Sequence, residues 1–208
     1  MRFVVISDTH GQHADLSLPE ADGIIHAGDI SKKGTLNQVQ DFLFWFQKLD
    51  YQYKIFIAGN HDFFFERAPQ HEVDELITDD LIYLNDSGVD INGVKIWGSP
   101  ITPYFNNWAF NRQRGAEIKP YWDLIPEDTD VLITHGPPYG ILDRTFFFKK
   151  VGCKELLDRV QAVKPRYHIF GHIHEANGRK EIDGVDYINA SNLNLRYKLV
   201  NPPVLIDL

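Results

Sequence analysis

Short apolar runs alternate along the chain with segments of helical periodicity. The runs are rich in β-branched and aromatic residues, and most end at Gly, Asp, Asn or His. This pattern is typical of buried strands, and it predicts strands over Phe3–Ile6, Gly23–Ala27, Lys54–Ala58, Val94–Trp97, Val131–Thr134, His168–Phe170, Val185–Asn189 and Val204–Asp207. Strands that alternate with helices predict an α/β layered fold with parallel pairing in much of its sheet.

Two of the intervening segments have apolar side chains at spacings of three and four residues, which predicts amphipathic helices from Leu36 to Phe46 and from Leu156 to Val163. Thr35 is expected to cap the first helix and Pro165 to end the second. The segment Val89–Ile96 alternates around an Asn-Gly pair and predicts a β-hairpin.

Two long segments, Ser99–Asp130 and Gly136–Lys150, lack periodicity. Loops of this length in a compact domain are usually functional or disordered, and their many aromatic residues argue against disorder. We therefore expect functional loops here.

Length and composition are those of a globular protein. A chain of 208 residues, 43% of them hydrophobic, predicts a single domain over residues 1–208. No apolar run is long enough to span a membrane, and the chain enters a strand at Arg2 without an export signal before it. Cys153 is the only cysteine, which excludes an intrachain disulfide or a thiolate metal cluster. We therefore expect a cytoplasmic protein with no membrane partner.

The net charge of −8 opposes attraction to phosphate backbones, and no stable nucleic-acid partner is expected. An acidic balance also suits a site that collects cations, although most Asp and Glu residues must simply lie on the solvated surface.

Five short polar motifs follow apolar runs, each where a strand is expected to end: Asp8-Thr9-His10, Gly28-Asp29, Gly59-Asn60-His61-Asp62, Thr134-His135-Gly136 and Gly171-His172-Ile173-His174. Ligands collect at the carboxyl ends of strands in open α/β sheets, so the five motifs can converge. Each motif alone is weak evidence, since an isolated Asp8-Thr9-His10 would more often be a strand-end turn in which the Asp caps a helix. Their ordered combination is strong evidence for one site.

The polar residues of these motifs suit metal ions. Carboxylate, amide and imidazole ligands without thiolates favour Mn, Fe or Zn over Ca²⁺. Seven such residues are too many for one ion. If Asp29 is shared, they divide into two shells of four, and ions about 3.5–4 Å apart form a clamp for phosphoryl transfer.

The same five motifs, in this order, resemble those of the calcineurin-like metallophosphoesterases, and the similarity spans most of the chain. Within that family the chain is most similar to the small metallophosphoesterase-domain-containing branch. The resemblance implies a four-layer α/β/β/α sandwich of two mixed β-sheets flanked by helices. It also implies one ion on Asp8, His10, Asp29 and His174, and a second on Asn60, His135, His172 and the shared Asp29. The branch also tolerates Gly at the position of His172, and the histidine here leads us to expect two divalent ions, Mn²⁺, Fe²⁺/³⁺ or Zn²⁺.

The expected activity is hydrolysis of phosphate esters, most plausibly small phosphodiesters such as cyclic nucleotides. Two cations lower the pKa of a shared water, so that hydroxide can attack the phosphorus in line. His61 follows the ligand Asn60 and is expected to donate a proton to the leaving oxygen, oriented by Asp62. Asn60 and His61 would also contact the substrate.

Other residues have a packing and a functional interpretation. The loop from Tyr104 to Phe110 is either a satellite hydrophobic cluster or a substrate wall, in which Phe105 or Trp108 stacks on a base and Arg112 contacts phosphate or sugar. His26 and His168 are expected in the core, and His13 and His71 at the surface or in loops. The run Phe146–Lys150 is either a lid edge or the patch of a homodimer, and Cys153 is expected to be packed.

Three other functions remain open from the sequence. The same site could serve a phosphomonoesterase or protein phosphatase, or a nuclease, although the acidic balance gives a nuclease no support. The third alternative is a nucleotide-binding regulatory protein with little activity.

Overall fold

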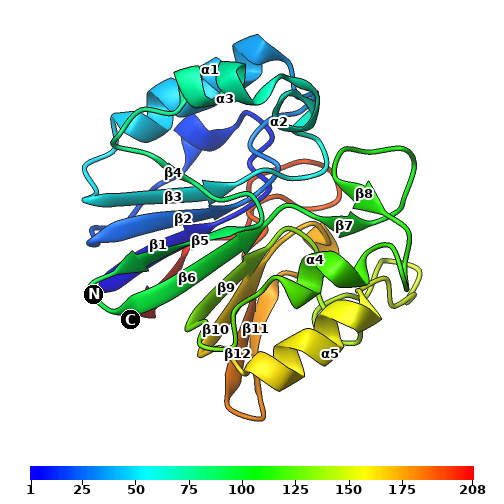
Figure 1. Ribbon diagram of the computed structural model, residues 1–208. Helices are drawn as coiled ribbons and strands as arrows, with labels where there is room; N and C mark the ends of the chain where they lie inside the picture. Colours follow the sequence, from blue (N-terminus) through cyan, green and yellow to red (C-terminus); the bar gives the residue numbers. More distant parts are fainter.

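Two β-sheets face each other in the middle of the molecule, and helices cover their outer sides (Figure 1). The computed structural model describes residues 1–208. The predicted α/β/β/α sandwich of two mixed sheets is confirmed.

The first sheet has the strand order β13-β1-β2-β3-β4. Its strands are β1 (Arg2–Ile6), β2 (Gly23–Ala27), β3 (Tyr53–Ile57), β4 (Ile82–Tyr83) and β13 (Val204–Asp207). Strands β1 to β4 are parallel, and β13 pairs antiparallel with β1. The outer side of this sheet is covered by α1 (Leu36–Gln47), α2 (Phe63–Arg67) and α3 (Gln70–Leu76), and a short 3₁₀ helix, η1 (His13–Asp15), follows β1 (Figure 1).

The second sheet has the order β11-β12-β10-β9-β6-β5. Its strands are β5 (Ser87–Ile91), β6 (Val94–Ser99), β9 (Val131–Thr134), β10 (Tyr167–Phe170), β11 (Gly178–Ile182) and β12 (Val185–Asn189). Helices α4 (Lys119–Asp123) and α5 (Lys154–Val163) cover its outer side (Figure 1). The strands β7 (Thr102–Pro103) and β8 (Asn111–Arg112) form a small separate sheet, and the 3₁₀ helix η2 (His174–Ala176) follows β10.

The four-layer arrangement explains why the central strands are apolar throughout. In β1, Phe3 and Val5 point into the core between the two sheets, whereas Val4 and Ile6 point toward the helices. All four side chains are fully buried. A strand that is buried on both faces favours apolar residues, and the polar residues of the five motifs follow where these strands end.

All eight predicted strands and both predicted helices are confirmed, with boundaries that differ by at most two residues. The hairpin joins β5 to β6 through Asn92 and Gly93, both with positive φ. Thr35 occupies the N-cap of α1, but its side chain makes no capping hydrogen bond. Measured by length and apolar content together, no helix of the structure could cross a membrane.

Candidate metal centre

Five strands from both sheets end at one edge of the sandwich. Asp8, Asp29 and Asn60 follow β1, β2 and β3, while His135 follows β9 and the His172 to His174 motif follows β10. The two sheets are joined directly at this edge, because the backbone N–H of His172 donates to both carboxylate oxygens of Asp8, at 3.0 Å each. The expected convergence of the five motifs therefore occurs.

Asp29 lies at the centre of the cluster. Its Oδ2 atom is 3.5 Å from His10 Nε2 and 3.4 Å from His135 Nε2, whereas its Oδ1 atom accepts a hydrogen bond from the backbone N–H of His61 at 2.8 Å. One carboxylate oxygen therefore faces two imidazole rings that the family resemblance assigns to different ions. This is the geometry that a shared ligand requires.

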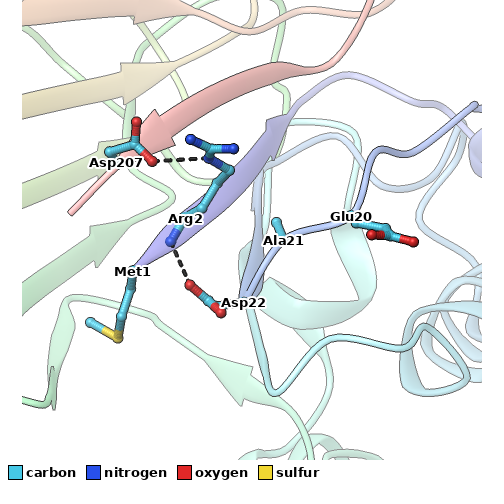
Figure 2. Close-up of a pocket in the computed structure, with 6 residues that line it drawn as sticks. All are labelled: Met1, Arg2, Glu20, Ala21, Asp22 and Asp207. Atoms are coloured by element: carbon cyan, nitrogen blue, oxygen red, sulfur yellow. Dashed lines mark hydrogen bonds and ion pairs between the residues drawn. The ribbon is translucent and has the colours of Figure 1, made fainter.

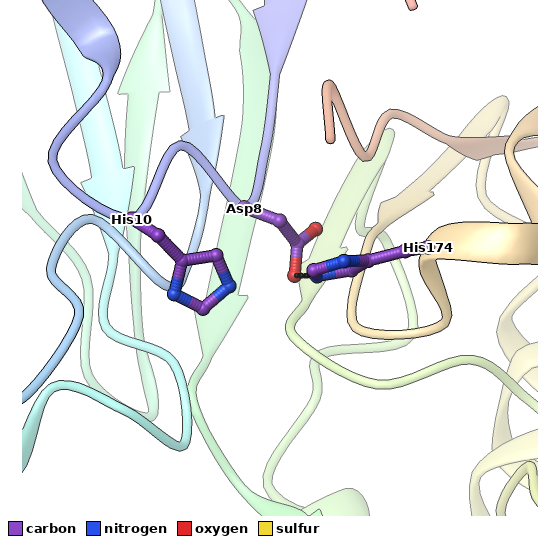
Figure 3. A group of neighbouring side chains, drawn as sticks. All are labelled: Asp8, His10 and His174. Carbon is purple, nitrogen blue, oxygen red and sulfur yellow. Dashed lines mark ion pairs between the residues drawn. The ribbon is translucent and has the colours of Figure 1, made fainter. Parts of the chain in front are cut away.

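Asp8 also lies between two imidazole rings, as Figure 3 shows, with His10 on one side of its carboxylate and His174 on the other. His174 Nε2 is 3.4 Å from Asp8 Oδ1. The ligand atoms of Asp8, His10 and His174 all lie within 4.8 Å of one another, close enough to hold one ion. Two further such groups exist, one of Asp8, Asp29 and His135 and one of His10, Asp29 and His61.

Backbone carbonyl groups hold four of the imidazole rings. The Nδ1 atoms of these rings lie 3.0–3.2 Å from a carbonyl oxygen, in the pairs His10 with Ser31, His61 with Lys32, His135 with Ala27 and His174 with Asn194. A carbonyl oxygen can only accept, so Nδ1 carries a proton in each pair and Nε2 is the ring atom left to face the cluster. Histidines that bind a metal through Nε2 are usually held in this way.

The backbone is strained at four residues of the metal motifs. Asp8, His10, Asp29 and His172 have φ values of 53°, 44°, 56° and 67°, in the left-handed region that non-glycine residues rarely adopt. Each such residue costs about 1–3 kcal/mol, and strain of this kind gathers at functional sites.

Close packing at the site also requires glycine at two positions. A Cβ atom on Gly59 would lie 2.3 Å from Asp29 Oδ1, and a Cβ atom on Gly171 would lie 2.0 Å from Asp8 Oδ2. At both positions the backbone passes too close to a carboxylate oxygen to leave room for a side chain.

The two central carboxylates are anionic. Burial alone would raise the pKa of Asp8, but the hydrogen bond and charge of His174 outweigh burial and hold the pKa well below its ordinary value. Burial acts on Asp29 in the same way, but the charge and hydrogen bond of His135, together with the charges of His10 and His61, hold its pKa well below the ordinary value. Burial would lower the pKa of His135, but Asp29 raises it to about 9. The two buried negative charges are therefore stabilised by the positive charge of the neighbouring His135 and His174 rings.

The residues present fit divalent ions. His10 Nε2 is buried and has no hydrogen-bond partner within the protein, although it points at the Asp29 carboxylate. A cation between these atoms would satisfy the ring nitrogen and compensate both carboxylates. The mixture of imidazole nitrogen and carboxylate oxygen suits Mn, Fe or Zn.

Asn60 and His172 lie beside the cluster. Asn60 Oδ1 is 2.9 Å from His135 Nε2, so these two candidate metal-ligand atoms lie side by side. The His172 ring is 5.1 Å from the His135 ring, centroid to centroid, but His172 belongs to none of the three tight groups. Its role as a ligand stays a prediction.

His61 and Asp62 do not form the expected pair. The Asp62 carboxylate accepts hydrogen bonds from the backbone N–H groups of Ile30, Ser31 and Gly59 and from the Ser31 hydroxyl, and from no atom of His61. The expectation that Asp62 orients His61 is therefore wrong. Asp62 is fully buried and ties the chain after β2 to the chain after β3, while His61 is held by the Lys32 carbonyl.

A pocket of about 220 Å³ opens onto the cluster. Its walls contain Phe105 and Trp108, as expected, and the Trp108 ring lies 4.1 Å from the His61 ring, centroid to centroid. Arg112 does not line it, because its guanidinium donates to Tyr121 Oη and to the Asn111 carbonyl and lies 3.8 Å from Glu66. The expectation that Arg112 contacts the substrate is corrected accordingly.

The sequence did not reveal three further lining residues, Glu175, Leu195 and Tyr197. Tyr197 packs edge-on against the His10 ring at 4.9 Å, centroid to centroid. It comes from the loop before β13, where no motif marks it. A partial signal was present for Glu175, which directly follows the last metal motif.

The remaining histidines follow the expectations. His26 and His168 are fully buried, burial lowers the pKa of each to about 3, and His71 is exposed. His13 lies in the connection between β1 and β2, but it is only 2% exposed, because its ring packs against Phe42 and Trp45, so it is not at the surface.

A larger hollow of about 520 Å³ lies at the amino end of β1 (Figure 2). The candidate metal centre lies beyond the carboxyl end of that strand. Arg2 in this hollow is already engaged, because its side chain donates to Asp207 and its backbone N–H to Asp22. The hollow contains none of the three ligand groups.

Together, the two-sheet sandwich and the buried carboxylate and imidazole cluster at its strand ends define the class of metallophosphoesterase-fold proteins. A profile of the calcineurin-like phosphoesterases matches residues 1–176, and the chain belongs to this family of phosphoester hydrolases. It is 42% identical to the human metallophosphoesterase domain-containing protein 1 over 231 aligned residues, which cover 100% of this chain and 71% of the relative. The mouse protein of the same name gives the same values.

Solved structures agree on the fold. The crystal structure of TT1561 of Thermus thermophilus superposes with a TM-score of 0.62 at 13% identity, covering 99% of this chain and 98% of that chain. The structure titled as a novel archaeal phosphodiesterase superposes with a TM-score of 0.51 at 16% identity, covering 99% of this chain and 100% of that chain.

Proposed function

We propose that the chain, as a single domain over residues 1–208, hydrolyses small phosphodiesters, including cyclic nucleotides, with two divalent ions. One observation carries the preference for diesters. The pocket above the cluster is lined by eleven residues, none of them Lys or Arg, and Glu175 adds a carboxylate to its wall. A diester carries one negative charge at its phosphate and a monoester up to two, so this pocket suits the diester better.

The ligand assignments are part of the proposal. Asp8, His10, Asp29 and His174 hold one ion, and Asn60, His135 and His172 hold the other together with Asp29. Bound ions at these positions supply a nucleophilic hydroxide at neutral pH and neutralise charge on the phosphoryl oxygens. The protein supplies the geometry, because the carbonyl groups that accept from Nδ1 fix each ring before substrate arrives.

His61 donates a proton to the leaving oxygen in this proposal. Its Nε2 atom lies at the pocket, 4.0 Å from Asp29 Oδ2, and its Nδ1 atom is held by the Lys32 carbonyl. The Trp108 ring covers one face of the imidazole and limits its movement. If this role is correct, His61→Asn slows hydrolysis of an alkyl ester far more than of a nitrophenyl ester, whose leaving group needs no proton.

The test compares bis(4-nitrophenyl) phosphate, 4-nitrophenyl phosphate and a cyclic nucleotide, each with Mn²⁺, Fe²⁺, Zn²⁺ or chelator. We expect kcat/KM for the aryl diester to exceed that for the monoester at least about tenfold, equivalent to about 1.4 kcal/mol. Chelator and Asp29→Asn should each abolish turnover. Asp207→Asn is the matched control, because Asp207 is an exposed aspartate at the opposite end of the sheet.

The outcomes separate the alternatives. Faster turnover of the monoester would identify a phosphomonoesterase and overturn the preference proposed here. Tight binding of nucleotide without turnover under any metal would identify a binding protein instead.

A further inference from the structure

A second hollow adjoins the candidate metal centre. It measures about 910 Å³, and Glu175 lines both this hollow and the 220 Å³ pocket above the metal cluster. The Glu175 carboxylate accepts a hydrogen bond from the backbone N–H of Phe146 at 2.6 Å, so its side chain joins the two lining segments. We call this hollow the Phe146 groove; its lining includes Leu142, Arg144, Phe146, Phe147, Phe148 and Lys150.

The groove exposes an unusual amount of apolar surface. Phe146, Phe147 and Phe148 are 68%, 78% and 78% exposed, in a loop between β9 and α5 (Figure 1). Single exposed apolar residues are common, but a contiguous aromatic patch marks a binding surface.

The loop that carries these rings is fixed by its own hydrogen bonds. Thr145 N–H donates to the Lys149 carbonyl at 2.9 Å, and Phe148 N–H donates to the Thr145 carbonyl at 2.8 Å. The buried Asp143 carboxylate accepts from the N–H groups of Gly140 and Gly152. The three rings are therefore presented to solvent by a built turn.

Size indicates that the metal pocket holds only part of a substrate. Sites for small molecules usually measure about 300–1,000 Å³, and the pocket above the cluster is smaller than this range. It has room for the reacting phosphoryl group and a short ester group. The Phe146 groove provides space for the rest of a longer molecule on the other side of Glu175.

The charges of the two hollows differ. The metal pocket has no basic residue, whereas the exposed Arg144, Lys150 and Lys180 line the Phe146 groove. They outnumber the two carboxylates of its lining, Asp143, which is buried, and Glu175, which accepts from the Phe146 N–H. Apolar rings with three cations around them complement a ligand that is apolar along its length and negative at its far end.

We propose that the Phe146 groove binds the second ester group of the phosphodiester substrate, and that this group is an apolar chain with a terminal negative charge. The proposal rests on the proposed phosphodiesterase function. It adds a substrate preference to that function, because the groove then determines which diesters are cleaved.

Three 4-nitrophenyl phosphodiesters test the proposal, with methyl, n-octyl and 7-carboxyheptyl as the second ester group, all below their micelle concentrations. For the protein with Mn²⁺, we expect KM to fall at least about tenfold from methyl to octyl, since each buried methylene favours binding. The carboxylated chain should lower KM about threefold further at low salt, and high salt should remove that gain.

Variants locate the effect. The double variant Phe147→Ser/Phe148→Ser should raise KM for the octyl ester about tenfold and leave the methyl ester unchanged. Lys150→Glu should remove only the gain from the carboxylate. Phe44→Ser is the matched control, because Phe44 is 61% exposed on α1, outside the groove.

Each result has one meaning. Equal KM values for the three esters, or an octyl preference that survives in the double variant, would overturn the groove assignment alone. Absence of turnover for all three esters with every metal would overturn the phosphodiesterase function and the groove assignment together. Unfolding midpoints equal to that of the unmodified protein show that the variants fold.

Discussion

Gly171→Ala tests whether the position of the Asp8 carboxylate determines activity. Gly171 directly follows β10 and is the first residue of the last metal motif. An added Cβ would lie 2.0 Å from Asp8 Oδ2 and 2.2 Å from Ser7 Oγ, both on fully buried side chains. Real Cβ contacts essentially never fall below 3.0 Å, so both contacts must lengthen, and the separation from Asp8 Oδ2 must grow from 2.0 Å to at least 3.0 Å.

The size of the effect follows from this displacement. Moving a catalytic group by about 1 Å costs on the order of 10²-fold in rate, so we expect kcat/KM to fall about 100-fold. Overpacking of a well-packed region costs about 1–3 kcal/mol, which in a chain of this size lowers Tm by roughly 2–12 °C. The variant should therefore fold and retain little activity.

The assay combines turnover of an aryl phosphodiester, metal content and thermal unfolding. Gly136→Ala is the control, because it also follows a strand at this edge but its Cβ would meet only Thr102 Cγ2 at 3.6 Å, an ordinary contact. We expect the control to change kcat/KM by less than about twofold. Full activity and full metal content in Gly171→Ala would refute the idea that Asp8 must keep this position.

Three further predictions concern buried polar groups. Asp62→Asn should lower the free energy of unfolding in urea by at least about 2 kcal/mol, because the amide nitrogen would face backbone N–H donors. An unchanged unfolding midpoint would contradict the role of Asp62 in tying the chain after β2 to the chain after β3. Burial lowers the pKa of His168 from 6.5 to about 3, so below pH 6.5 the unfolded chain binds a proton that the folded chain excludes. Stability should fall by about 1 kcal/mol from pH 6 to pH 5 on account of this residue, and His168→Gln, which keeps a partner for the Thr134 hydroxyl, should lack that component. His172→Gly should change the unfolding free energy by less than about 1 kcal/mol, because relief of the left-handed strain offsets lost packing, while metal analysis should show loss of one ion; two retained ions would exclude His172 as a ligand.

The positions of the strands and the metal motifs could be predicted because they depend on the same fact. Strands such as β1 and β9 are buried on both faces, so their sequences are almost wholly apolar and the polar motif follows at the end of the strand. Parallel strands end at one edge, which places the marked residues together. The apolar runs in the sequence therefore indicate both where the strands lie and which polar residues meet at the edge of the sheets.

The walls of the site could not be predicted in this way. Tyr197 reaches the His10 ring from the loop before β13, far along the chain, and no local pattern indicates such a contact. Asp62 was misassigned for a related reason, since proximity to His61 in sequence does not fix the direction of a side chain. The turn after Asn60 directs the carboxylate into the protein, toward Ile30 and Ser31.

The groups that orient the metal ligands are also invisible in the sequence, because they belong to the backbone. Ala27, Ser31 and Asn194 hold His135, His10 and His174 through carbonyl oxygens, which any residue type would provide. Only the fold can bring a carbonyl to within hydrogen-bond distance of Nδ1. The side chains of the five motifs therefore determine which ions can bind, whereas the path of the backbone determines whether the ring nitrogens point at them, and a substitution that shifts that path without touching a ligand should impair the site as severely as loss of a ligand.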